Sequence, residues 1–331
     1  MPLFKRGARD VDPPAVRVDV TFGDPRAKRA RLAARSNDGD TLHALVAETD
    51  DPHEREFLLY AALDGIPRAP WIDNLPDRYP DSSAAWAIRG VHTLRATWKD
   101  LGGEGRGAPT DEDTRRRWRE HLDLADRDLM HATRLGGADD PVPWSYLVAT
   151  GSGLGLTFKE ICDRFDEADQ RVPWMLLAHH HLFQATSPAG VGNDETMFAV
   201  AGDIAARAPE GCACLDMIAL AHLDRARREP ATPDDAGMAA YFDDPDVRAT
   251  LDRAARRSVE SKAFDPRPQA VMARNAFAYA FVAAGELDRA RGLFLHIGDQ
   301  PSELPWGWDD PDPGLAYARA RQRAGVSGDE T

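Results

Sequence analysis

The sequence has 331 residues, of which 43% are hydrophobic and 29% are charged, and its formal net charge is -14 at pH 7. Such a chain is long enough to bury a sizeable core, while its negative charge repels phosphate groups and argues against nucleic acid or an anionic membrane as a partner. Three cysteines are too few for a disulfide framework, and neither a signal-peptide pattern nor the roughly 20 uncharged apolar residues of a membrane span occur, so we expect a cytoplasmic protein.

The first 23 residues are rich in proline and charge, and they predict an extended N-terminal arm (1–23) with at most one edge strand at Val16–Val20. Apolar residues then recur at intervals of three and four, which predicts short helices over 24–35, 41–48 and from Asp51 to the Gly65–Pro67 stop. We expect residues 24–135 to form a group of N-terminal helical hairpins.

A helix over 84–98 carries Trp86 and, one turn later, Gly90. Glycine inside a helix costs about 1 kcal/mol relative to alanine, so Gly90 predicts the close approach of a neighbouring helix. Residues 101–110, with several glycines, predict a surface loop, and a long helix follows over 111–135.

Proline and tryptophan punctuate the second half of the chain. Pro143-Trp144 and Pro173-Trp174 each precede an apolar periodic segment, which predicts that each pair opens a helix. We predict helices over 144–150, 156–168, 174–186, 194–208, 213–228, 245–260, 268–284, 286–297 and 312–323. No second run of strand-like alternation occurs, so the predicted fold class is all-α.

The segment Ala273–Pro301 resembles a tetratricopeptide (TPR) repeat. The resemblance is carried by Ala278 and Phe281 on the first helix, Gly285 at the turn, Ala290 and Phe294 on the second helix, and Pro301. Arg274 stands where that family prefers tryptophan. The resemblance implies antiparallel helical hairpins stacked as a right-handed α-solenoid, with TPR-like repeats over 136–325 and a disordered tail over 326–331.

Residues 174–225 are also similar to uncharacterised bacterial, actinobacterial-type helical-repeat proteins. The similarity is carried by Leu182-Phe183-Gln184-Ala185, Glu195-Thr196-Met197-Phe198-Ala199, Ala208-Pro209-Glu210-Gly211 and Ala221-His222-Leu223. A bacterial source also fits the dominance of arginine, because lysine supplies only five of the 41 basic residues. This resemblance implies a helical fold and brings no activity with it.

The run His179-His180-His181 is the first candidate for chemistry, with His222 as a possible neighbour. Successive helical residues point about 100 degrees apart, so three adjacent histidines cannot share one metal ion. We predict that His179 or His180 is a hydrogen-bonded interior residue. The alternative is a metal-dependent or other enzyme built around His179–His181 and His222, although no HExxH or paired-cysteine motif accompanies them.

Two further motifs have simple structural interpretations. Cys212-Ala213-Cys214 lacks the spacing of a redox or zinc motif and predicts buried cysteines at a helix start. The glycine-rich stretch Gly151–Gly155 follows a predicted helix instead of the strand that a phosphate-binding loop needs, so we expect an interhelical turn. We therefore assign no catalytic, metal or cofactor-binding residue.

Two segments are candidates for binding. The loop at 187–193 carries Gly190 and Gly192, which could bring backbone N–H groups near a ligand, and it ends at Asn193, which could instead be a simple helix N-cap. Trp306 and Trp308 could form an exposed aromatic clasp for a basic peptide, or a lid over the last hairpin.

These patterns favour a non-catalytic module that binds a protein or peptide, with a basic or neutral partner suited to the acidic chain. An alternative role is a structural subunit of a larger assembly. The sequence predicts no cofactor and leaves the oligomeric state open.

Overall fold

The computed structural model describes residues 12–102, 108–137, 139–229, 235–308 and 310–326. All regular secondary structure within these ranges is helical, so the predicted all-α fold class is confirmed for the described residues. The ends of the predicted arm and tail, residues 1–11 and 327–331, and residues 103–107 of the predicted loop lie outside them.

Contacts between Cα atoms divide the chain into two compact units. The first, here called the N-terminal unit, comprises residues 23–197. The second, the C-terminal unit, comprises residues 198–331 together with residues 1–22. The boundary predicted after residue 135 lies inside the N-terminal unit.

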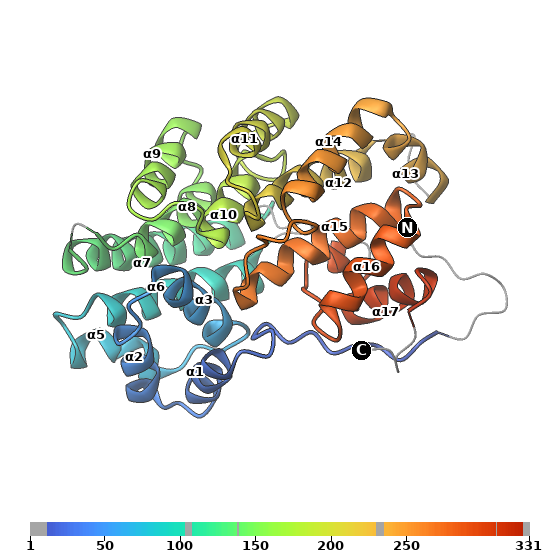
Figure 1. The fold of residues 1–331 in the computed structure, drawn as a ribbon. Coiled ribbons are helices and arrows are strands. Elements are labelled where there is room, and N and C mark those ends of the chain that lie inside the picture. The colour runs from blue at the N-terminus through green and yellow to red at the C-terminus, as the bar shows by residue number, and fades with distance from the viewer. Residues whose placement is uncertain (1–11, 103–107, 138, 230–234, 309, 327–331) are drawn as a thin grey trace. The chain divides into compact units, whose positions relative to one another are not determined.

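The N-terminal unit consists of ten helices and the start of an eleventh among its described residues (Figure 1). In chain order they are α1 (Pro25–Arg35), α2 (Gly39–Ala47), α3 (Pro52–Leu63), α4 (Pro70–Asp73), α5 (Leu75–Arg78), α6 (Ser83–Leu101), α7 (Glu112–Leu135), α8 (Val142–Leu154), α9 (Phe158–Asp169), α10 (Leu176–Thr186) and α11 (Asp194–Arg207), which continues into the C-terminal unit. Proline in the first turn and an aspartate before it start both α1 and α3, as the sequence predicts.

Gly90 lies where α6 packs against α7. A β-carbon at this position would lie 2.8 Å from Cγ of Leu129 and 3.2 Å from the backbone oxygen of Ala125, both on α7. Only glycine therefore allows the two helices to approach this closely, which confirms the packing reason predicted for it.

Three details of the N-terminal unit differ from the predictions. The short helices α4 and α5 were not predicted, and α8 continues through the predicted turn to end at Leu154, with Gly155 in the left-handed conformation. Pro173-Trp174 does not open α10, which begins at Leu176. Trp174 has a φ of 66°, and its N–H donates to the Asp169 carboxylate at 3.2 Å.

The C-terminal unit is also helical in its described residues. After α11 come α12 (Asp216–Arg228), α13 (Asp235–Phe242), α14 (Pro245–Arg257), α15 (Val271–Ala283), α16 (Leu287–Ile297) and α17 (Pro313–Arg323). Helices α15 and α16 pack against each other across the turn at Gly285, whose φ is 74°. Helix α13 was not predicted.

The N-terminal arm packs against α17 without forming a strand in residues 12–22. The Val16 N–H donates to the backbone oxygen of Gly314 at 3.3 Å, and Asp12 forms an ion pair with Arg319 at 2.9 Å. These contacts place the start of the described chain in the same unit as its end.

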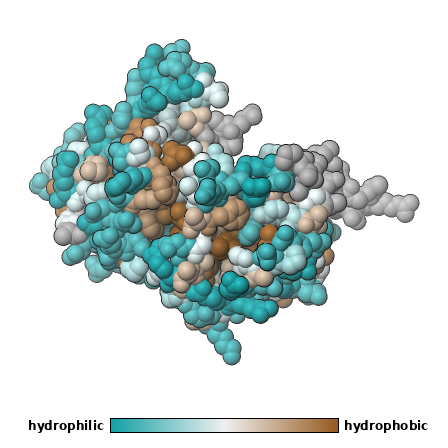
Figure 2. All heavy atoms as spheres, turned by 90° about the horizontal axis from the view of Figure 1, so that it is seen from above, coloured by the Kyte–Doolittle hydropathy of each residue, from teal (hydrophilic) through white to brown (hydrophobic). Residues whose placement is uncertain are grey.

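Hydrophilic residues cover most of the face shown in Figure 2, in keeping with the charged fraction of the sequence, and a smaller hydrophobic area lies among them. Among the described helices, none combines the length and the apolar character needed to cross a bilayer.

Candidate functional site

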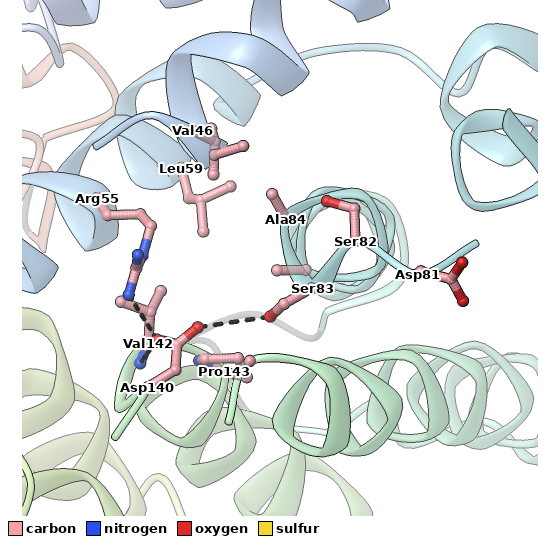
Figure 3. A pocket seen from close by; sticks show the side chains of 13 residues that line it. Val46, Arg55, Leu59, Asp81, Ser82, Ser83, Ala84, Asp140, Val142 and Pro143 are labelled. Atoms are coloured by element: carbon pink, nitrogen blue, oxygen red, sulfur yellow. Dashed lines mark hydrogen bonds and ion pairs between the residues drawn. The ribbon is translucent and has the colours of Figure 1, made fainter. Parts of the chain in front are cut away.

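A cavity of about 300 Å³ lies in the N-terminal unit, where α2, α3, α6 and the start of α8 meet (Figure 3). This volume is at the low end of the range found for ligand sites, roughly 300 to 1,000 Å³. The apolar part of its wall is formed by Val46, Leu59, Ala84, Ala87, Val142 and Pro143. Ala47 and Asp81 also line it and are exposed, so the cavity reaches the surface.

One ion pair is built into the cavity wall. Arg55 of α3 and Asp140, just before α8, lie 2.7 Å apart, and their side chains are only 19% and 11% exposed. Asp140 also accepts from the Val142 N–H at 3.1 Å and from the Ser83 hydroxyl at 3.4 Å, as Figure 3 shows for the serine. The Arg55 charge is thus already neutralised by the chain itself.

The rim of the cavity is acidic and polar. Asp81 is exposed, and Ser82 next to it is held by His43, whose Nε2 lies 2.8 Å from the Ser82 hydroxyl. Gly136 allows close packing here, because a β-carbon would lie 2.7 Å from Oδ2 of Asp140. A partly apolar wall with a carboxylate at the rim suits a side chain that combines an aliphatic stem with a positive charge.

Next to Arg55 on the same helix, Glu56 has a fully buried carboxylate. It accepts a short hydrogen bond from the Ser145 hydroxyl, and bonds from the N–H groups of Leu177 (3.2 Å) and Ala178 (3.1 Å) in the first turn of α10. Burial raises the pKa of Glu56 to about 7, against the opposing effect of these hydrogen bonds. A carboxylate from α3 therefore caps a helix more than a hundred residues away.

Each of the three adjacent histidines has different surroundings. His179 is fully buried, with Nδ1 2.8 Å from the backbone oxygen of Met175 and its ring stacked on Trp174. His180 is half-buried, and its charge favours the ionised form of Glu56. His181 places Nδ1 3.0 Å from the backbone oxygen of Ser145, and burial lowers its pKa to about 4.

His222 belongs to the C-terminal unit. Its Nδ1 lies 2.9 Å from the Tyr241 hydroxyl, its ring packs beside Phe198, and burial lowers its pKa to about 4. Within the part of the chain that the structure describes, no group of three or more His, Cys, Asp or Glu side chains could hold a metal ion.

The predicted binding loop folds tightly against the end of α10. A β-carbon on Gly190 would lie 2.5 Å from the backbone oxygens of Gln184 and Ala185, and one on Gly192 would lie 2.0 Å from that of Thr186. Asn193 accepts from the Thr196 N–H at 2.9 Å and donates its own N–H to the Thr196 hydroxyl at 2.8 Å. These contacts are those of a helix N-cap on a compact loop.

The two C-terminal tryptophans contact their own chain. Trp306 is fully buried and donates from Nε1 to Oδ1 of Asn275 at 2.7 Å. Trp308 is half-buried, its ring centroid lies 5.0 Å from Cζ of Arg227, and its backbone oxygen accepts from the same arginine at 2.9 Å. Both contacts match the predicted lid more closely than an exposed clasp.

Sequence reasoning did not identify the cavity or the Glu56 network. The one available signal for Glu56 was its place beside Phe57 on the buried face of a short helix, where a charge is unusual. Comparison of the chain with protein-family models, with curated proteins and with solved structures gives no significant match.

Proposed function

We propose that this chain is a non-catalytic, TPR-like helical-repeat protein, with its hairpins stacked as a right-handed α-solenoid, that binds a protein or peptide partner. The support comes from the succession of packed helix pairs, such as α6 with α7 and α15 with α16, and from the resemblance of the Ala273–Pro301 segment. In this proposal the cavity beside Arg55 receives one side chain of the partner.

The observation that carries the proposal is the combination of a partly apolar wall with an exposed acidic residue at the rim. Arg55 is neutralised by Asp140, so the wall requires no anion, while Asp81 at the rim is exposed. A lysine or arginine of the partner would place its methylene stem along Val46 and Leu59 and its charge near Asp81. The net charge of -14 favours the approach of such a basic segment.

Two tryptophan substitutions test which surface binds. Ala47→Trp fills the mouth of the cavity from an exposed position, and Ala189→Trp adds the same bulk at an exposed position of the 187–193 loop. Binding is measured by fluorescence anisotropy, with labelled short peptides that differ only in the number of lysines and arginines. We expect Ala47→Trp to weaken binding of the lysine-containing and arginine-containing peptides about tenfold or more, which corresponds to roughly 1.4 kcal/mol.

The matched variant Ala189→Trp should bind like the unmodified protein. Asp81→Asn should weaken only the charged peptides, and its effect should shrink as salt is added because the carboxylate is exposed. Loss of binding in Ala189→Trp alone would move the site to the loop. Equal binding by all three variants and the unmodified protein would rule out the cavity.

A further inference from the structure

Arg274, near the start of α15 in the C-terminal unit, packs on an aromatic ring and has no carboxylate partner among the described residues. It is half-buried, and its Nε is buried without a hydrogen-bond partner. Within the described residues its guanidinium forms no ion pair. Burial lowers its pKa, and no carboxylate of the described residues opposes that effect. Leaving a cation partly buried and uncompensated is costly, so such a group calls for a specific explanation.

Other arginines of the described chain have a carboxylate partner, which Arg274 lacks. Several that are buried or half-buried combine an aromatic ring with a carboxylate. Four examples are Arg89 with Trp86 and Asp128, Arg95 with Tyr60 and Asp64, Arg289 with Phe281 and Glu260, and Arg321 with Tyr317 and Asp299. In each case the ring covers one side of the guanidinium, and the carboxylate accepts from its edge. This arrangement covers the flat face with a ring and pairs the charge with a carboxylate. It does not bond every donor, because Nε of Arg95 is buried without a hydrogen-bond partner, like Nε of Arg274.

Arg274 has the ring and lacks the carboxylate. Its Cζ lies 4.6 Å from the centroid of the Phe264 ring, a distance within the range of those four pairs. The acid that lies nearest in sequence to that ring, Asp265, forms its ion pair with Arg267 at 2.9 Å. The chain therefore positions the guanidinium and encloses its Nε, and it leaves the two Nη groups without a hydrogen bond to any described residue.

We infer that Arg274, held against Phe264, is a binding site for a carboxylate that a ligand supplies. A planar carboxylate matches the two parallel N–H donors of a guanidinium edge. Placement near the N-terminal end of α15 adds the favourable potential of the helix dipole. This inference concerns the C-terminal unit and does not depend on the proposed role of the cavity.

The test follows the Nε–H group of Arg274 by NMR in protein labelled with ¹⁵N-arginine. Its signal is identified as the one that disappears in Arg274→Lys. We expect it to shift saturably when sodium acetate is added, and to stay unchanged with sodium chloride at equal ionic strength. The signal of Arg321, which already has Asp299 as its partner, should not respond. Equal responses of Arg274 to acetate and chloride would overturn the inference.

A stability measurement provides the second readout. Without added acetate, Arg274→Leu should unfold at the same temperature as the unmodified protein or at a higher one, because the substitution removes an uncompensated cation. Acetate should then raise the unfolding temperature of the unmodified protein, and should have no such effect on Arg274→Leu. In the control Arg321→Leu, the unfolding temperature should fall while the acetate effect remains. An acetate effect that persists in Arg274→Leu would place the site elsewhere.

The carboxylate could come from the C-terminus of a chain or from an acidic side chain, and a set of peptides distinguishes these two sources. A peptide with a free C-terminus, its C-terminal amide, and the amide with one internal glutamate are compared with acetate and succinate. Saturable binding by any carboxylate-bearing member supports the inference, and the strongest binder identifies the source. Binding by the glutamate-free amide as strong as by the free acid would contradict it.

Discussion

Replacing Trp306 with alanine is expected to lower the free energy of unfolding by about 4 kcal/mol, within the range of roughly 3 to 5 kcal/mol for truncation of a buried aromatic side chain. The indole is enclosed by the rings of Tyr279, Phe294 and Tyr317, with centroids 5.0 to 5.9 Å away. Its loss also leaves Oδ1 of Asn275 without the indole donor in a buried site, which adds a desolvation cost. Urea denaturation followed by circular dichroism measures the change.

Trp308→Ala is the matched control two residues away. Because Trp308 is half-buried and its main partner is the Arg227 side chain, we expect a loss of about 1 kcal/mol or less. Similar losses in both variants would mean that the whole 306–308 segment acts as one cover over the last helices. A larger loss for Trp308→Ala would contradict the assignment of Trp306 as the buried anchor.

Helices with strong local signals could be predicted closely from sequence. Asp24-Pro25 starts α1 where predicted, and Gly285 separates α15 from α16 as the TPR resemblance implies. In these cases the capping aspartate, the first-turn proline and the turn glycine act through contacts within a few residues. Gly90 shows that even a tertiary contact is predictable when a residue is locally unfavourable and so needs a packing reason.

Features that depend on distant partners could not be predicted. Pro173-Trp174 has the same local pattern as Pro143-Trp144, yet only the latter lies in a helix, because the Asp169 carboxylate accepts the Trp174 N–H and holds it in the left-handed region. Helix α13 has only eight residues, too few to show a clear period. Its prediction would require knowledge of what packs against it.

The candidate site was missed for the same reason. Arg55 and Asp140 are 85 residues apart, and Glu56 lies 121 residues before Leu177, so no sequence motif joins them. The histidine run stands out in the sequence because three adjacent histidines are rare. The structure instead gives each histidine its own surroundings, and burial also strongly perturbs the pKa of Glu56, which lies outside the run.

That glutamate leads to the second large effect, on the pH dependence of stability. The pKa of Glu56 is about 7 in the folded chain and 4.5 for an unperturbed glutamate. Between these values the unfolded chain releases the proton and the folded chain keeps it, so the free energy of unfolding falls as pH rises. At 1.36 kcal/mol for each pKa unit, we expect a loss of about 3 kcal/mol between pH 4 and pH 8 from this group.

Glu56→Gln removes this titration while preserving the size of the side chain. The unmodified protein should therefore lose about 3 kcal/mol relative to the variant between pH 4 and pH 8, whichever of the two is more stable at the acid end. Stability is measured by urea denaturation at each pH. Glu48→Gln, at an exposed position, is the control and should run parallel to the unmodified protein.

The unmodified protein must be compared with Glu56→Gln because other groups titrate in the same pH range. His181, which shares Ser145 with Glu56, has a pKa lowered to about 4, so its contribution to stability is lost as pH falls from about 6.5 toward 4. In the unmodified protein this loss of stability at low pH opposes the gain from Glu56. In Glu56→Gln only the loss from His181 remains, so the difference between the two stability curves gives the contribution of Glu56. Parallel curves would show that Glu56 titrates near its ordinary pKa, and that the Ser145 hydroxyl and the α10 N–H groups fully compensate its burial.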